Sequence, residues 1–141
     1  LIITAILGRQ IVLTARIFPQ YLAYFNEFVG GPANGYKYLD DSNLDWGQNL
    51  KMLAEYQRSH PGTKVIYHWP YSYPDYYGIT DNQAFLKTKW WREPSGRYAA
   101  DINFLIRARI VSFIKNEPSL DWLSVYKPID RIGYSYLIYE F

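Results

Sequence analysis

Residues 36–69 contain the pattern that most constrains the fold of this chain. Tyr36–Leu39 is expected to form a short strand, and Trp46–Ser59 has the period of an amphipathic helix. The predicted inner face of that helix comprises Trp46, Leu50, Leu53, Ala54 and Gln57. Lys64–Trp69, KVIYHW, is rich in the β-branched and aromatic residues that favour strands. A strand, a helix and a strand in succession are typical of an α/β unit with a right-handed crossover.

The rest of the chain extends this prediction to a small sheet. Arg97–Ile106 and Ile132–Phe141 have strand character, and Arg107–Lys115 and Pro118–Tyr126 are expected to be helical. Both alternating sets of side chains in the last run are largely apolar or aromatic, so both faces of that strand should be covered. The predicted fold class is α/β, a sheet of about four to five strands with flanking helices and a preceding N-terminal juxtamembrane helix.

The N-terminal segment is the most apolar part of the chain. Its apolar run, Leu1–Leu7, is shorter than the ~20 residues needed to cross a bilayer, and Arg9 and Arg16 follow it rather than precede it. We therefore expect the tail of a transmembrane helix rather than a signal peptide. Residues 11–29 repeat large apolar side chains at helical spacing, with a kink or a new helix expected around Pro19.

Composition excludes several functional classes. The chain has no cysteine, which removes disulfides, thiolate catalysis and zinc–thiolate sites. The net charge is +2 without a cluster of basic residues, so no nucleic-acid partner is predicted. Aromatic residues make up 19% of the chain, which suits a membrane interface, a sugar-binding face, a protein contact or a core built mainly from rings.

The stretch DDSNLDWGQNL, residues 40–50, resembles the start of a calcium loop. Asp41, Asn43 and Asp45 alternate as the first ligands of such a loop would. The sixth position is Trp46 instead of glycine and the twelfth is Met52 instead of glutamate, so no metal site is predicted.

A helix start explains the same stretch more simply. With Asp45 as N-cap, Gln48 is the third helical residue and completes a capping box; with Ser42 as N-cap, Asp45 takes that place. Such a helix N-terminus can also hold hydroxyls or a phosphate. Whether this stretch binds a ligand or is only structural stays open from sequence.

A second candidate surface follows the strand Lys64–Trp69. Aromatic side chains are dense there around Asp75, as sugar recognition requires, although a tyrosine-rich loop packed over a sheet edge or at a membrane gives the same pattern. The histidines, His60 and His68, lack metal-ligand spacing, and no catalytic residue is predicted. The candidate ligand-binding residues are Asp41, Asn43, Asp45, Trp46, Gln48, Trp69, Asp75 and Tyr77.

Several strings, in order, resemble the C-terminal extracytoplasmic region of membrane glycosyltransferases that use a polyprenyl-phosphate sugar donor, the superfamily of protein O-mannosyltransferases and aminoarabinose transferases (glycosyltransferase family 39-like). The strings are PQYLAYFNE (19–27), GGP (30–32), DSNLDWGQ (41–48), PDYYG (74–78) and KPIDRIGYS (127–135). YLAYFNE and DSNLDWGQ are specific, and the later ones are looser.

The resemblance implies a polytopic protein of the cell membrane. Residues 1–30 would be the end of a transmembrane segment and a juxtamembrane amphipathic helix, and residues 31–141 an extracytoplasmic α/β domain. The family's catalytic acids lie near its first transmembrane helices, so this fragment would be non-catalytic, without a cofactor, and would help to position a lipid-linked sugar or a glycan acceptor. The alternatives are a free-standing carbohydrate- or protein-binding module without enzymatic activity and a soluble hydrolase with an acid pair.

Overall fold

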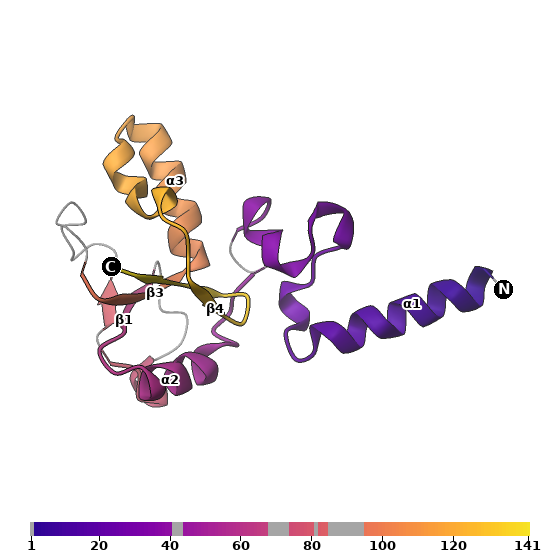
Figure 1. Ribbon diagram of the computed structural model, residues 1–141. Coiled ribbons are helices and arrows are strands. Elements are labelled where there is room, and N and C mark those ends of the chain that lie inside the picture. Colours follow the sequence, from indigo (N-terminus) through magenta and orange to yellow (C-terminus); the bar gives the residue numbers. More distant parts are fainter. Residues whose placement is uncertain (1, 41–43, 68–73, 81, 85–94) are drawn as a thin grey trace.

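The computed structural model describes residues 2–40, 44–67, 74–80, 82–84 and 95–141. In this part of the chain a five-stranded mixed sheet has the order β2-β1-β3-β5-β4 (Figure 1). The strands are β1 (Lys64–Tyr67), β2 (Asn82–Ala84), β3 (Arg97–Asp101), β4 (Asp130–Ile132) and β5 (Tyr136–Glu140). β1 is parallel to β2 and β3, whereas β5 is antiparallel to β3 and β4. The predicted α/β class, a small sheet with flanking helices after an N-terminal helix, is confirmed.

Helices cover both faces of the sheet. Helix α2 (Leu50–Ser59) and helix α3 (Ile102–Lys115) lie on opposite sides of it in Figure 1. The α2 side buries Leu53 against Val65 and Ile138, and the α3 side buries Phe104 against Ile66. Tyr136, Leu137, Ile138 and Tyr139 of β5 are all buried, so the prediction that both faces of this strand are covered is confirmed.

Helix α2 begins later than predicted. Its buried residues are Leu50, Leu53, Ala54 and Gln57, which match the predicted face. Trp46 lies outside the helix in the preceding turn, and more than half of its surface is exposed. The prediction that the helix starts at Trp46 is therefore wrong, because Gly47 adopts a left-handed φ of 82° that interrupts helical geometry.

The expected strand Tyr36–Leu39 is also wrong. Residues Pro32–Lys37 form a 3₁₀ helix, η3. Pro32 suits the first turn of a helix, and Asn34 and Gly35 favour turns over strands. A Cβ on Gly35 would lie 2.7 Å from the Phe25 ring, so the segment packs closely here in a helical turn.

The predicted strand Arg97–Ile106 divides into a strand and a helix. β3 ends at Asp101, whose Oδ1 accepts a 2.8 Å hydrogen bond from the backbone N–H of Asn103 and caps α3. The predicted helix Arg107–Lys115 is present but starts five residues earlier, at Ile102. At its other end Asn116 is left-handed, with φ of 51°.

The C-terminal run is a hairpin rather than one strand. β4 ends at Ile132, Gly133 turns with φ of 53°, and β5 starts at Tyr136. The helix expected at Pro118–Tyr126 is the 3₁₀ segment η7 (Pro118–Val125), packed beside α3.

Helix α1 (Ile2–Ile17) projects away from the sheet (Figure 1). It ends two residues before Pro19, and only two short 3₁₀ turns, η1 (Tyr21–Ala23) and η2 (Glu27–Val29), follow where a kinked or new helix was expected. Ile17 is the buried residue of α1. No helix in the described ranges is long and apolar enough to cross a membrane.

Candidate functional site

The carboxyl ends of the parallel strands β1 and β3 gather polar side chains. Tyr67 ends β1, Asp101 ends β3, and the Tyr67 ring meets the Tyr136 ring edge to face at 6.1 Å between centroids. Burial raises the pKa of Tyr67, and the carboxylates of Asp101, Asp45 and Asp75 raise it further. Ligands of open α/β sheets bind at this edge, so this carboxyl-edge cluster is the candidate site.

Asp45 is held inside the cluster. It is 4% exposed, and its Oδ1 accepts hydrogen bonds from the backbone N–H of Gly47 at 3.0 Å and from Ser135 Oγ at 2.8 Å. Burial raises the pKa of the Asp45 carboxyl, and the bonds from Ser135 and Gly47 lower it by less. The carboxylate therefore organises the turn before α2 and is not open to a ligand.

Ser135 and Asn49 complete this arrangement. Asn49 Nδ2 donates to Ser135 Oγ at 2.6 Å, and both residues are fully buried. Gly133 passes so close that a Cβ there would lie 2.5 Å from Asn49 Oδ1. We call Asp45, Asn49, Gly133 and Ser135 the latch, because they join the turn before α2 to the β4–β5 turn.

The capping-box prediction is wrong. Helix α2 has Asn49 at its N-cap position, and the Asn49 side chain accepts no hydrogen bond from the helix N–H groups. Gln48 bonds within the preceding turn instead: its Oε1 accepts from the Trp46 N–H at 2.7 Å and its Nε2 donates to the Leu44 carbonyl at 2.9 Å. Asp45 and Gln48 thus stabilise a turn rather than the helix end.

The other predicted site residues are only partly brought together. Asp75 and Tyr77 lie in the 3₁₀ helix η5 (Pro74–Tyr77), where the half-buried Tyr77 packs against the α2 side of the core. Tyr76 beside it is exposed, and the two rings meet edge to face at 5.2 Å. Asp41, Asn43 and Trp69 lie outside the described residues, as does His68.

Sequence reasoning missed four members of this region. Asn49, Tyr67, Asp101 and Ser135 are buried polar residues in segments that read as helix or strand. A hydroxyl residue inside the apolar C-terminal run was the available signal for Ser135. No local sequence pattern predicted that Asp101 and Asp45 would both lie near Tyr67, because the two carboxylates are far apart in the chain.

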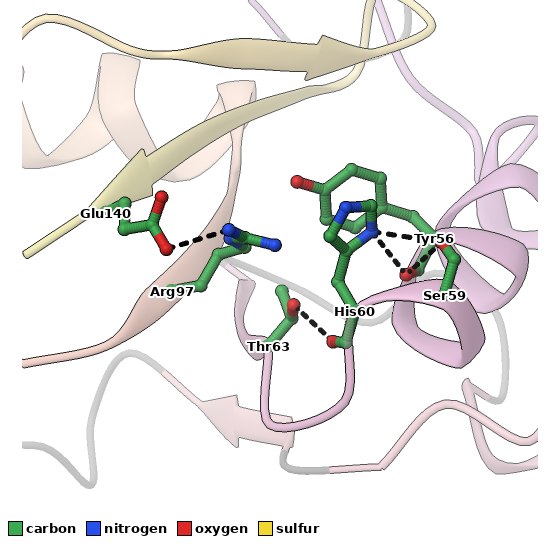
Figure 2. A network of polar contacts seen from close by, with 6 residues as sticks. All are labelled: Tyr56, Ser59, His60, Thr63, Arg97 and Glu140. Atoms are coloured by element: carbon green, nitrogen blue, oxygen red, sulfur yellow. Dashed lines mark hydrogen bonds and ion pairs between the residues drawn. The ribbon is translucent and has the colours of Figure 1, made fainter.

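A second polar cluster lies at the far end of α2. Figure 2 shows the His60 imidazole flat against the Tyr56 ring, at 4.2 Å between centroids, and Arg97 reaching between Tyr56 and Glu140. Arg97 Nη2 donates to Glu140 Oε1 at 2.7 Å across β3 and β5. Burial raises the pKa of Tyr56, Arg97 lowers it, and the carboxylates of Asp130 and Glu140 raise it, so the pKa is raised on balance. His60 Nδ1 lies 3.0 Å from Ser59 Oγ, a contact between neighbouring residues at the C-terminal end of α2.

This second cluster is a partly exposed set of surface contacts. The Glu140 side chain is half exposed, so its ion pair with Arg97 is screened by water. Within the described ranges, no three His, Cys, Asp or Glu side chains lie close enough to hold a metal ion. No protein-family model, curated protein or solved structure matches this chain.

Proposed function

We propose that this chain is the non-catalytic, extracytoplasmic C-terminal domain of a cell-membrane glycosyltransferase that uses a polyprenyl-phosphate sugar donor, and that it helps to position the donor or the acceptor. The observation that carries the proposal is helix α1, an apolar helix that stands clear of the domain (Figure 1).

The exposed surface of α1 is costly in water. Ile3, Ile6, Leu7 and Ile11 are 73, 61, 60 and 70% exposed. Burying an isoleucine or leucine side chain contributes roughly 1.5–3 kcal/mol, so four such side chains gain several kcal/mol in a lipid environment. Arg9, near the middle of the helix, pairs with Glu27 at 2.6 Å, so the charge among these apolar side chains has a partner. This distribution supports a helix with its apolar part in lipid and its end at the interface.

The latch supports the resemblance and the non-catalytic role. Two of the resembling strings, residues 41–48 and 127–135, meet in space through the hydrogen bond between Asp45 and Ser135. Because Asp45 is buried and bonded to Ser135 and Gly47, it is withdrawn from acid–base work on a substrate.

Sugar transfer provides the direct test. The longest reading frame that contains this sequence should encode further apolar segments of ~20 residues upstream. Its product should transfer sugar from a polyprenyl-phosphate donor, whereas residues 1–141 alone should not. Transfer by residues 1–141 alone would contradict the non-catalytic role, and a frame without upstream apolar segments would contradict the membrane enzyme.

Membrane binding tests the role of α1 separately. Residues 1–141 should sediment with phosphatidylcholine vesicles, and the Ile3→Ser/Ile6→Ser variant should not. A matched control is Ile110→Ser/Ile114→Ser, which changes two exposed isoleucines on α3 instead. Equal loss of vesicle binding in both variants would contradict the proposal that α1 is the element that binds the membrane.

One observation favours the alternative, a carbohydrate-binding module. Tyr76 is 85% exposed and lies beside Tyr77 and Asp75, as a stacking ring beside a carboxylate would in a sugar site. Tyr76→Ala should abolish retention on a glycan array if this function holds, while Tyr38→Ala, which removes another exposed tyrosine, should not.

A further inference from the structure

A hollow of about 280 Å³ lies where α1 meets the domain. We call it the foot hollow. Its walls include Arg16 and Gln20 from the end of α1 and the following turn, Met52 from α2, and Arg131 and Tyr134 from the β4–β5 hairpin. Its volume corresponds to roughly nine water molecules at ~30 Å³ each, which is enough for a small polar head group.

Two arginines without carboxylate partners line the foot hollow. Within the residues that the structure describes, neither Arg16 nor Arg131 forms an ion pair. The nearby Glu27 is paired with Arg9, and Asp130 Oδ1 accepts from the backbone N–H of Arg131 at 2.7 Å. The hollow therefore has two available guanidinium groups, which bind phosphate oxygens well through their several N–H donors.

The Arg131 guanidinium packs over the ring of Tyr134. Its guanidinium carbon lies 5.9 Å from the centroid of the Tyr134 ring, within the range of a cation–π contact. Tyr134 also lines an adjacent hollow of about 130 Å³ that shares Arg16 and Ile17. Arg16, Ile17 and Tyr134 line both hollows, and Arg131 lines the foot hollow.

Gln20 adds an unsatisfied acceptor to the same wall. It is 8% exposed, and its Oε1 has no hydrogen-bond partner in the part of the chain that the structure describes. Its Nε2 makes a long 3.5 Å contact with Met52 Sδ, which is a weak acceptor. Buried acceptors of this kind are rare in proteins, and this one is covered by protein atoms.

The depth of the hollow along α1 indicates which anion it meets. The exposed apolar side chains of the helix continue to Val12, four residues before Arg16, and the charged residue among them, Arg9, is paired with Glu27. At 1.5 Å per residue Arg16 lies roughly 6 Å beyond Val12 along the helix axis. The polar layer of a bilayer extends about 5–7 Å beyond each side of the hydrocarbon core. With the apolar part of α1 in lipid, the foot hollow would lie at the level of the phospholipid phosphates.

We propose that the foot hollow binds the head group of an anionic glycerophospholipid. Arg16 and Arg131 donate to the phosphodiester oxygens. The inference rests on the membrane placement of α1 in the proposed function. It adds a specific lipid contact that orients the domain on the membrane surface.

The test compares phosphatidylcholine vesicles with and without phosphatidylglycerol, at constant ionic strength. The wild-type chain should bind the anionic vesicles more tightly. Arg16→Gln/Arg131→Gln should lose about 30-fold in affinity for them, about fivefold per arginine, and should keep its binding to pure phosphatidylcholine. The matched control Lys115→Gln/Lys127→Gln removes two exposed charges elsewhere and should lose much less.

The outcomes separate the two proposals. Wild-type affinity of the double arginine variant for anionic vesicles would overturn the foot-hollow site while leaving the membrane role of α1 standing. Absence of binding to any vesicle would overturn the placement of α1. Suppression of the anionic preference by inorganic phosphate would indicate a free-phosphate site and overturn the lipid assignment. Should the double variant fail to fold, Arg16→Gln alone, on the projecting helix, should show the fivefold loss.

Discussion

Ser135 Oγ donates a 2.8 Å hydrogen bond to Asp45 Oδ1 across 90 residues of the chain. The same hydroxyl oxygen accepts from Asn49 Nδ2, so a single serine connects the turn before α2 to the β4–β5 hairpin. All three side chains are buried, and the Ser135 hydroxyl is a hydrogen-bond partner of both Asp45 and Asn49. This relationship explains why the polar stretch before α2 is part of the core.

Ser135→Ala should destabilise the domain. The change leaves the Asp45 carboxylate without one donor and Asn49 Nδ2 without its acceptor, at a cost of about 1–3 kcal/mol in the free energy of unfolding. Urea denaturation of the variant and the wild type measures this difference in the free energy of unfolding. Ser119→Ala, which removes an exposed hydroxyl bonded to Glu117, is the control and should change stability by less than about 0.5 kcal/mol.

Asp45→Ala and Asp45→Asn should behave differently. Alanine removes the acceptor for Gly47 and Ser135, so it should cost about 2–4 kcal/mol. Asparagine keeps an oxygen acceptor without the buried charge and should stay within about 1 kcal/mol of the wild type at pH 7. Equal losses in the two variants would show that the charge itself holds the turn.

The contribution of Asp45 to the stability of the fold should change with pH in a definite direction. Burial raises the folded pKa of Asp45 above its ordinary value of 3.8, so the fold prefers the protonated form. The contribution of Asp45 is then complete below pH 3.8 and is lost as the pH rises through the folded pKa. Relative to Asp45→Asn, the wild type should become less stable over that rise, as urea midpoints at a series of pH values would show. A difference that runs the other way would contradict the assigned environment.

Gly133→Ala should be more damaging than a typical substitution at a left-handed glycine. Gly133 has φ of 53°, and its new Cβ would lie 2.5–2.7 Å from the Asn49 amide. The backbone strain alone costs about 1–2 kcal/mol, and the clash adds to it. Gly62→Ala is the matched control, because Gly62 has φ of 83° and open space around it. Similar melting temperatures for the two variants would show that Asn49 moves aside without cost.

Tyr67→Phe should leave the stability unchanged or raise it slightly. The Tyr67 hydroxyl is buried without a hydrogen-bond partner among the described residues, so its removal relieves a desolvation cost of up to about 1–3 kcal/mol. Thermal unfolding of the variant measures the effect. A fall in stability of more than about 1 kcal/mol would show that the hydroxyl has a bound partner such as an ordered water.

Deletion of residues 1–12 should not lower the stability of the sheet domain. Residues 2–12 are exposed, and the shortened chain keeps the half-buried Leu13 and the buried Ile17. The denaturant midpoint should stay constant, and aggregation of the purified chain should decrease because the apolar helix surface is gone. A large drop in midpoint would show that α1 packs on the domain in solution.

Local pattern was sufficient for the elements that carry strong apolar periodicity. β1 and the buried face of α2 follow from KVIYHW and from the spacing of Leu50, Leu53, Ala54 and Gln57. β5 and its two covered faces follow from the aromatic and apolar run at the C-terminus. In each case the signal and the structure occupy the same few residues.

Short segments were harder to predict because local turn chemistry competed with strand propensity. Pro32, Asn34 and Gly35 directed their segment into a 3₁₀ helix although Tyr36–Leu39 resembled a strand. Asp101 ended β3 by capping α3, and this role becomes visible only when its side chain is seen to accept from Asn103. The position of each boundary depended on one hydrogen bond or one close contact.

The sequence by itself determined the α/β class, the face that α2 buries and the apolar character of α1, since these properties depend on residue spacing along the chain. Only the tertiary structure decided that Asp45 is a buried hydrogen-bond acceptor rather than an exposed cap, because its partner Ser135 comes from the other end of the domain. It also brought Arg16 and Arg131 to one hollow, through the packing of the β4–β5 hairpin against the base of α1.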